Sequence, residues 1–97
     1  EDVCSFIHKA ILGQETACEL YNVGYGSCFS VTDIVQKIIN ASGKNIKITY
    51  DASKPTIKTK LALISDKARG ELGWSPHISL DEGIRRTMAW YKENIQP

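Results

Sequence analysis

Apolar positions in the first half of the chain recur at the spacing of amphipathic helices. One stripe, ended by Gly13, consists of Val3, Phe6, Ile7, Ala10 and Ile11. A second stripe, ended by Gly43, consists of Val31, Ile34, Val35, Ile38 and Ile39. Ser30 can cap the start of this second stripe, and Asp33 stands three residues further on, as in a capping box. Helices are therefore predicted over residues 3–13 and 30–43, each with one apolar face.

Two more helices are predicted in the last third of the chain. Ser65 or Asp66 can cap a short helix that ends at Gly73. Ser79 and Glu82 have the spacing of a capping box at the start of the last helix. Its apolar positions at successive turns are Leu80, Ile84, Met88 and Tyr91.

Three other segments have the pattern of β-strands. Residues 20–23 form an apolar and aromatic run that stops at a glycine-containing turn, 24–26. Residues 46–50 alternate apolar with polar side chains, and a short apolar run at 61–64 follows a polar loop. About four helices with a few short strands predict an α/β fold class, or α+β for the piece in isolation.

Length and charge limit the range of functions. With 97 residues, of which 42% are apolar, the chain can bury one modest core. Its net charge is only +1, but residues 1–43 carry a net −3 while residues 44–69 carry seven basic side chains and two Asp. An anion is therefore expected to bind in the middle of the chain. The few aromatics are not interleaved with the Lys residues, so no nucleic-acid partner is predicted.

No membrane span and no secretory signal are predicted. No apolar run approaches the roughly 18 residues that a bilayer requires, and the amino terminus carries acids where a signal peptide has basic residues. The three cysteines, Cys4, Cys18 and Cys28, have no close paired spacing, so neither disulfides nor a zinc site is predicted. We expect a cytoplasmic protein with reduced thiols. Because the chain starts without Met, we also expect it to belong to a longer polypeptide.

Two short motifs suggest dehydrogenase chemistry, but their context argues against it. The turn at 24–26 lies between a predicted strand and a predicted helix, yet Phe29 occupies the third glycine position of a dinucleotide-binding loop. Tyr50 and Lys54 have the spacing of a catalytic Tyr and Lys, which requires a helix that Pro55 disfavours. Neither a catalytic nor a cofactor-binding residue is therefore assigned to this chain.

Histidine and cysteine spacing gives no better site. Cys4 and His8 are one helical turn apart and could offer two ligands to a metal, with Cys18 and Cys28 supplying more, but neither Cys18 nor Cys28 has a close partner in the sequence. A cysteine on an amphipathic helix is usually a small apolar packing residue. No metal site is predicted.

The basic loop over residues 51–60 is the strongest candidate site. Lys54, Lys58 and Lys60 lie within seven residues, where their ammonium groups could converge on a diphosphate. A solvated charged loop explains this spacing equally well.

Longer stretches resemble a known family. The run LGWSPHISLDEGIRRTMAWY at 72–91, with YNVG at 21–24, SVTDIVQKI at 30–38 and DASKPT at 51–56, resembles the carboxy-terminal third of extended short-chain dehydrogenase/reductases acting on nucleotide sugars. The similarity covers nearly the whole chain. DASKPT looks most like the GDP-L-fucose synthase branch, followed by UDP-glucose 4-epimerase-like and dehydratase branches.

The resemblance implies a two-part enzyme. Its amino-terminal Rossmann domain would bind NAD or NADP and hold the catalytic Ser/Thr, Tyr and Lys, none of which is recognised in these 97 residues. Residues 1–97 would then form a single carboxy-terminal domain that closes over a GDP- or UDP-sugar and is not catalytically competent alone. Which sugar, which nucleotide, which reaction and whether the parent is a homodimer stay open.

The same resemblance implies roles for the basic loop. Lys54 aligns with a basic residue that approaches the substrate phosphates, and Lys60 falls where many members have Arg. The family's usual Pro-Gly-Asp or Pro-Asp-Gly is here Pro55, Thr56 and Ile57. The predicted substrate-binding residues are Lys54, Thr56, Lys58 and Lys60. The alternative is a small free-standing binding or interaction module without enzymatic activity, whose apolar helix faces bind a protein partner.

Overall fold

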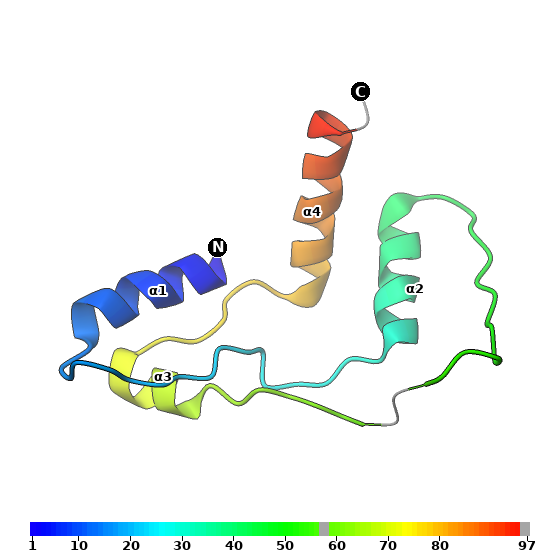
Figure 1. The fold of residues 1–97 in the computed structure, drawn as a ribbon. Helices are drawn as coiled ribbons and strands as arrows, with labels where there is room; N and C mark the ends of the chain where they lie inside the picture. Colours follow the sequence, from blue (N-terminus) through cyan, green and yellow to red (C-terminus); the bar gives the residue numbers. More distant parts are fainter. Residues whose placement is uncertain (57–58, 96–97) are drawn as a thin grey trace. The chain divides into compact units, whose positions relative to one another are not determined.

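The computed structural model describes residues 1–56 and 59–95, and four α-helices lie within them (Figure 1). They are α1 (Asp2–Gly13), α2 (Val31–Ser42), α3 (Asp66–Leu72) and α4 (Leu80–Asn94). Each lies where the hydrophobic spacing and capping residues predicted a helix. The chain divides into two compact units: unit 1 is Glu1–Cys28 with Leu61–Ile78, and unit 2 is Phe29–Lys60 with Ser79–Pro97.

The predicted α/β fold class is wrong for the described residues, which contain no β-strand. A strand requires a ladder of backbone hydrogen bonds to a neighbour, and the alternation at 46–50 does not supply that neighbour. In unit 1 the Gly26 amide donates to the Leu63 carbonyl at 3.1 Å. Beside it, the Ser65 hydroxyl accepts from the Gly24 amide and donates to the Gly24 carbonyl. One backbone bond and a serine bridge do not make a ladder.

Unit 1 is organised around Trp74, which lies just after α3 and is 2% exposed. Its indole N–H donates to the Asp2 carbonyl at 3.1 Å and to the Ser5 hydroxyl at 2.9 Å. Ala68 of α3 is fully buried in the same unit. A buried tryptophan needs a partner for its N–H, and here the first turn of α1 provides that partner.

Aromatic contacts extend this core to the segment between α1 and α2. The Phe6 ring meets the Trp74 ring edge-on at 5.5 Å and the Tyr21 ring at 5.7 Å between centroids. The Tyr21 hydroxyl donates to Glu71 at 2.9 Å, and the Lys67 ammonium lies 4.8 Å from the Tyr21 ring centroid. Burial and this carboxylate raise the pKa of Tyr21. Edge-on aromatic pairs and a cation over an aromatic ring stabilise a fold beyond the contribution of the buried apolar surface.

The start of α1 also holds the segment that follows Trp74. The Asp2 carboxylate accepts hydrogen bonds from the backbone amides of His77 and Ile78, the latter at 3.0 Å. The Ile78 amide is the main cause that lowers the pKa of Asp2, so this carboxyl is ionised when it accepts these bonds. Lys9 donates to the Gly73 carbonyl at 2.7 Å. Residues 73–78 are thus fixed to α1 through Gly73, Trp74, His77 and Ile78.

Unit 2 is built from α2 and α4, which pack against each other. The α2 capping box is complete: the Asp33 amide donates to Ser30 at 3.0 Å and the Ser30 amide donates back to the Asp33 carboxylate. Lys37 of α2 forms an ion pair with Asp81 of α4 at 2.7 Å. The capping box thus stabilises the start of α2, and the ion pair joins α2 to α4.

The predicted capping box of α4 is only half formed. Ser79 accepts a hydrogen bond from the Glu82 amide at 3.2 Å. The Glu82 carboxylate binds Arg85 and Arg86 instead of reaching back to the Ser79 amide, and these guanidinium groups lower the pKa of Glu82 to about 2. Arginine at the third and fourth positions after a glutamate competes successfully for its carboxylate.

The described residues include no helix that is both long and apolar enough to cross a membrane.

Replacing Trp74 should destabilise unit 1 far more than replacing the second tryptophan. Trp74→Ala removes a buried ring and leaves the Ser5 hydroxyl and Asp2 carbonyl without the indole donor. The free energy of unfolding should therefore fall by about 3–5 kcal/mol. Trp90, which is 57% exposed, is the matched control, because Trp90→Ala should change stability by less than about 1 kcal/mol. Urea unfolding followed by circular dichroism measures both. Equal losses in the two variants would contradict this assignment of the core.

Candidate functional site

The predicted substrate-binding residues lie on the irregular segment that follows α2. The α2 helix ends at Gly43, whose φ of 65° turns the chain out of the helix. Lys54, Thr56 and Lys60 are all exposed in this segment, whereas Lys58 lies outside the described residues. Three of the four predicted side chains are therefore accessible to a ligand from solvent.

A tight turn precedes Lys54. The Asp51 carboxylate accepts hydrogen bonds from the Ser53 amide at 3.0 Å and from the Ser53 hydroxyl at 2.6 Å. The Lys54 amide donates to the Asp51 carbonyl at 3.4 Å. Carboxylate side chains that bond the backbone two residues on stabilise turns of this kind. Pro55 restricts the Lys54 backbone from the other side, so the start of the loop has a defined conformation.

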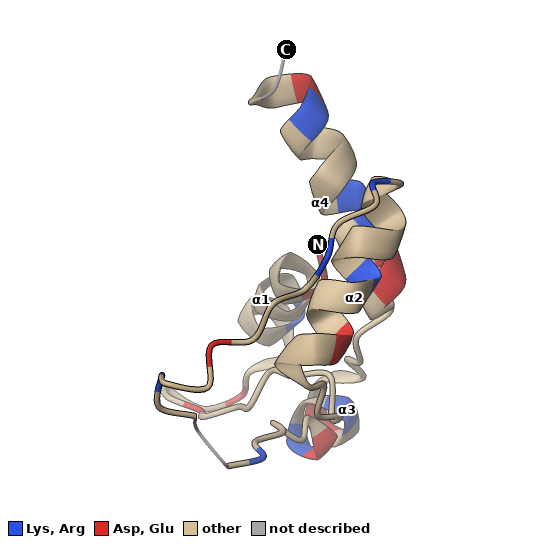
Figure 2. Cartoon of the chain, turned by 90° about the vertical axis from the view of Figure 1, so that its right-hand side faces the viewer, with Lys and Arg blue, Asp and Glu red and all other residues tan. Residues whose placement is uncertain are grey.

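The electrostatics of this segment favour an anion. Residues 44–60 contain five Lys and a single acid, Asp51, and basic positions outnumber acidic ones along the segment in Figure 2. The Ser53 side chain and amide lower the pKa of Asp51, so its charge persists at neutral pH. The segment still carries a positive net charge.

Three lysines outside the basic segment, Lys9, Lys37 and Lys67, have structural partners. Lys37 pairs with Asp81, and Lys67 donates to Glu19 at 2.6 Å, which raises the pKa of Lys67. Neither Lys54 nor Lys60 forms an ion pair or a side-chain hydrogen bond with any residue in the described part of the chain. Lys44 and Lys47 share this property, and so does Lys92 of α4. Their ammonium groups remain available for an external anion.

The turn at Gly24 and Gly26 has a packing explanation. A Cβ at Gly24 would lie 2.6 Å from the Leu63 Cβ and 2.7 Å from the Leu63 carbonyl oxygen. Gly26 has a φ of 79°, and its amide already donates to Leu63. Close approach and left-handed backbone require these glycines, as the turn interpretation predicted.

The Tyr–Lys spacing and the cysteines are not arranged for catalysis or metal binding in the described part of the chain. No helix covers residues 50–54, so Tyr50 and Lys54 lack the helical spacing of a catalytic pair. Cys4, Cys18 and Cys28 are free and exposed. Within residues 1–56 and 59–95, no group of three or more His, Cys, Asp or Glu side chains could hold a metal ion.

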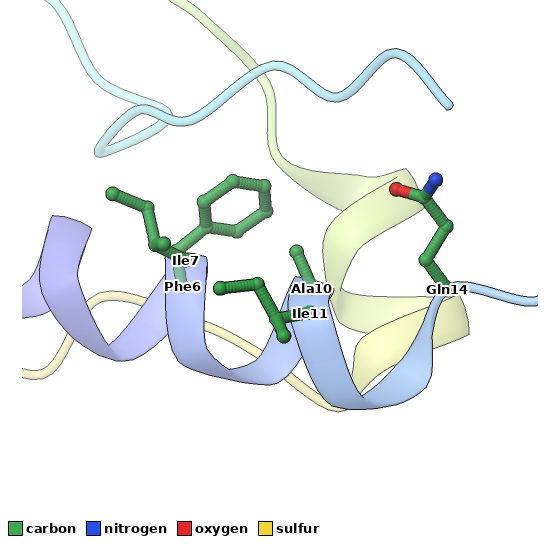
Figure 3. Close-up of a pocket in the computed structure, with 5 residues that line it drawn as sticks. All are labelled: Phe6, Ile7, Ala10, Ile11 and Gln14. Carbon is green, nitrogen blue, oxygen red and sulfur yellow. The ribbon is translucent and has the colours of Figure 1, made fainter. Parts of the chain in front are cut away.

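Two features were missed from the sequence. One is the turn made by Asp51 and Ser53, whose Asp-x-Ser spacing before Lys-Pro is a usable signal. The other is a hollow of about 350 Å³ on α1, shown in Figure 3. Its lining residues are Phe6, Ile7, Ala10, Ile11 and Gln14. The helical stripe was predicted to face a core, and the structure leaves much of it uncovered.

Similarity to curated enzymes covers nearly the whole chain. It is 32% identical over 88 residues to UDP-glucose 4-epimerase 3 of Oryza sativa subsp. japonica, covering 91% of this chain and 24% of that protein. It is 31% identical over 94 residues to a putative GDP-L-fucose synthase 2 of Arabidopsis thaliana, covering 97% and 27%. It is 31% identical over 104 residues to dTDP-glucose 4,6-dehydratase of Salmonella typhimurium, covering 99% and 28%.

These matches define the family. The chain belongs to the extended short-chain dehydrogenase/reductases that include nucleotide-sugar epimerases, dehydratases and GDP-L-fucose synthases, as the 72–91 run predicted. It spans about a quarter of the length of the curated relatives it matches. No protein-family model and no solved structure matches the chain.

The turn before Lys54 can be tested through the ionisation of Asp51. The pKa of Asp51 is lowered below 3.8 in the folded chain. Its bonds to Ser53 therefore stabilise the folded state fully above pH 3.8, and this stabilisation is lost as the pH falls through the lowered pKa. Ser53→Ala should raise the pKa of Asp51 back toward 3.8. NMR titration of the carboxyl carbon measures this shift. Ser27→Ala, which leaves the turn intact, should not change it, and an unaltered Asp51 pKa in Ser53→Ala would rule out the hydrogen bond from the Ser53 hydroxyl to Asp51.

Proposed function

We propose that this chain is the carboxy-terminal, substrate-binding part of an NAD(P)-dependent enzyme that epimerises, dehydrates or reduces a nucleotide sugar. Its Lys54-bearing segment receives the diphosphate of that substrate. The chain contributes binding and orientation, while hydride transfer belongs to residues outside it. The observation that carries the proposal is the similarity along 80–99% of the chain to relatives named for nucleotide-sugar substrates.

The names of these relatives indicate which part of the substrate they have in common. They specify UDP-glucose, GDP-L-fucose, dTDP-glucose and UDP-glucuronate, so both the base and the sugar vary. The diphosphate is the part of the substrate that all of them share. A region that is similar to all these enzymes can therefore bind the diphosphate without selecting a particular base.

The charge of the basic segment fits this role. A diphosphate at neutral pH carries two or more negative charges on exposed oxygens, and ammonium groups bind such oxygens strongly. Lys54 and Lys60 are exposed and have no acidic partner in the described part of the chain. Thr56, exposed between them, adds a hydroxyl donor. Lys58 lies outside the described residues and joins this group only by its position in the sequence.

Binding at the diphosphate assists a reaction that takes place on the sugar. Interactions with a non-reacting part of the substrate hold the reacting carbon in register with the cofactor and the catalytic groups. NAD or NADP would supply the hydride acceptor and donor, held by a Rossmann domain that precedes this chain. No residue of this chain is assigned to that chemistry.

Uncovered apolar side chains on α1 are consistent with such a domain. Val3, Ile7 and Ile11 are 58%, 50% and 74% exposed and follow one another along one stripe. The hollow in Figure 3 lies on the same helix. A row of this kind favours burial against another protein surface. We assign it to the cofactor-binding domain of the same polypeptide.

Removing either exposed lysine should weaken substrate binding. Lys54→Ala and Lys60→Ala, made in the enzyme polypeptide that carries this chain, should each weaken GDP and UDP binding roughly 10-fold to 100-fold, since bonds to charged groups contribute about 1.5–3 kcal/mol. Lys54→Arg should retain most of the affinity. Isothermal titration calorimetry measures these changes.

Lys44→Ala is the matched control for net charge. It removes the same charge from the same segment and should weaken binding by less than about threefold at physiological salt. Unchanged affinity in both Lys54→Ala and Lys60→Ala would overturn the site assignment. An upstream reading frame without a glycine-rich strand–turn–helix would instead favour a free-standing binding module.

The α1 stripe gives a separate test of the domain partner. Ile11→Asp in the enzyme polypeptide places a charge in the proposed interface and should lower its melting temperature by several degrees. His8→Asp introduces the same charge on the same helix outside the stripe and should have little effect. Differential scanning calorimetry compares the two. Equal melting temperatures for Ile11→Asp and the unmodified enzyme would contradict burial of this face.

A further inference from the structure

We propose that Asp51 is a positioning residue that holds Lys54 in place for diphosphate binding. This inference rests on the proposed function, because it concerns how Lys54 performs that role. It adds an acidic residue to a site that charge alone would assign only to basic ones. Asp51 makes no contact with the ligand in this scheme and acts through the backbone of its own turn.

The hydrogen bonds of the turn lead from Asp51 to Lys54. Both groups of Ser53, the amide at 3.0 Å and the hydroxyl at 2.6 Å, donate to one carboxylate oxygen of Asp51. The Lys54 amide then donates to the Asp51 carbonyl at 3.4 Å. With Pro55 limiting the Lys54 backbone on the other side, the direction in which the lysine leaves the loop is set by the turn.

An exposed lysine gains from such a constraint. A lysine side chain has many rotamers, and an unstructured loop adds backbone freedom that binding must remove. A turn formed before the ligand arrives removes the backbone part of this cost in advance. The ordered turn at 51–54 therefore favours binding although its key side chain is negative.

Charge and geometry make opposite predictions for Asp51. A carboxylate close to a bound diphosphate repels it, so if charge alone mattered, any substitution that removes the negative charge would tighten binding. If the turn matters, a substitution that removes the acceptor oxygen weakens binding, and one that keeps the oxygen without the charge does not. Asparagine keeps the oxygen and alanine does not.

The test compares Asp51→Ala with Asp51→Asn in the enzyme polypeptide, with GDP and UDP titrated by calorimetry. Asp51→Ala should weaken both ligands by about threefold to tenfold, within the usual range of coupling between neighbouring residues. Asp51→Asn should bind them as tightly as the unmodified enzyme or more tightly. Ser53→Ala, which removes only the hydroxyl bond, should give a smaller loss.

Three controls show whether the effect passes through Lys54 and the phosphates of the ligand. In a Lys54→Ala background, Asp51→Ala should cause no further loss, and guanosine and uridine, which lack phosphates, should bind the Asp51→Ala variant normally. Glu93→Ala removes the same charge from α4 and should leave the affinity for GDP unchanged. A general loss of folding would weaken nucleosides and nucleotides alike.

The outcomes separate this inference from the proposed function. If Lys54→Ala weakens GDP binding but Asp51→Ala does not, the positioning role is overturned and the binding site stands. Equal tightening by Asp51→Ala and Asp51→Asn would also overturn it, because only charge would then matter. If Lys54→Ala leaves GDP and UDP affinity unchanged, the site assignment fails and the role of Asp51 fails with it.

Discussion

The hydrogen bonds of the Trp74 indole to α1 are the interaction on which unit 1 depends. Trp74 follows α3 in the sequence, yet its N–H donates to Asp2 and Ser5 in the first turn of α1. Its ring lies against Phe6, and the backbone just beyond it donates to the Asp2 carboxylate. A single buried side chain thus joins the two ends of the unit, and its polar atom makes the position of α1 specific.

Unit 2 uses its polar side chains differently. Lys37 is engaged with Asp81, and the α4 arginines are engaged with Glu82, so these charges support helices. The segment after α2 contains lysines with no such partner in the described part of the chain and a turn that fixes Lys54. Among the described residues, lysines without a partner are therefore concentrated in the segment after α2, with Lys92 of α4 as a further one. This concentration of unpaired lysines is the physical basis for our proposal that a diphosphate binds the segment after α2.

Family membership and the candidate site rest on different parts of the chain. The run at 72–91, which first indicated the family, contains Trp74 and the start of α4, and these residues pack, cap and pair. They contribute to the folding of unit 1 and unit 2. The site rests on Lys54 and its neighbours, where the structure contributes exposure and a turn. A mutation in the family run is expected to act through folding, and one in the basic segment through binding.

The sequence by itself determined the four helices, because helical spacing and capping residues such as Ser30 and Ser79 act within a few residues of the chain. It also determined the family and the basic segment, which depend on residue order and charge alone. Only the tertiary structure decided that 46–50 forms no strand, that Glu82 binds arginines and not its own cap, and that Asp51 holds a turn beside Lys54. Strand formation needs a partner segment, and a carboxylate chooses among donors by distance, so neither outcome can be read from local pattern.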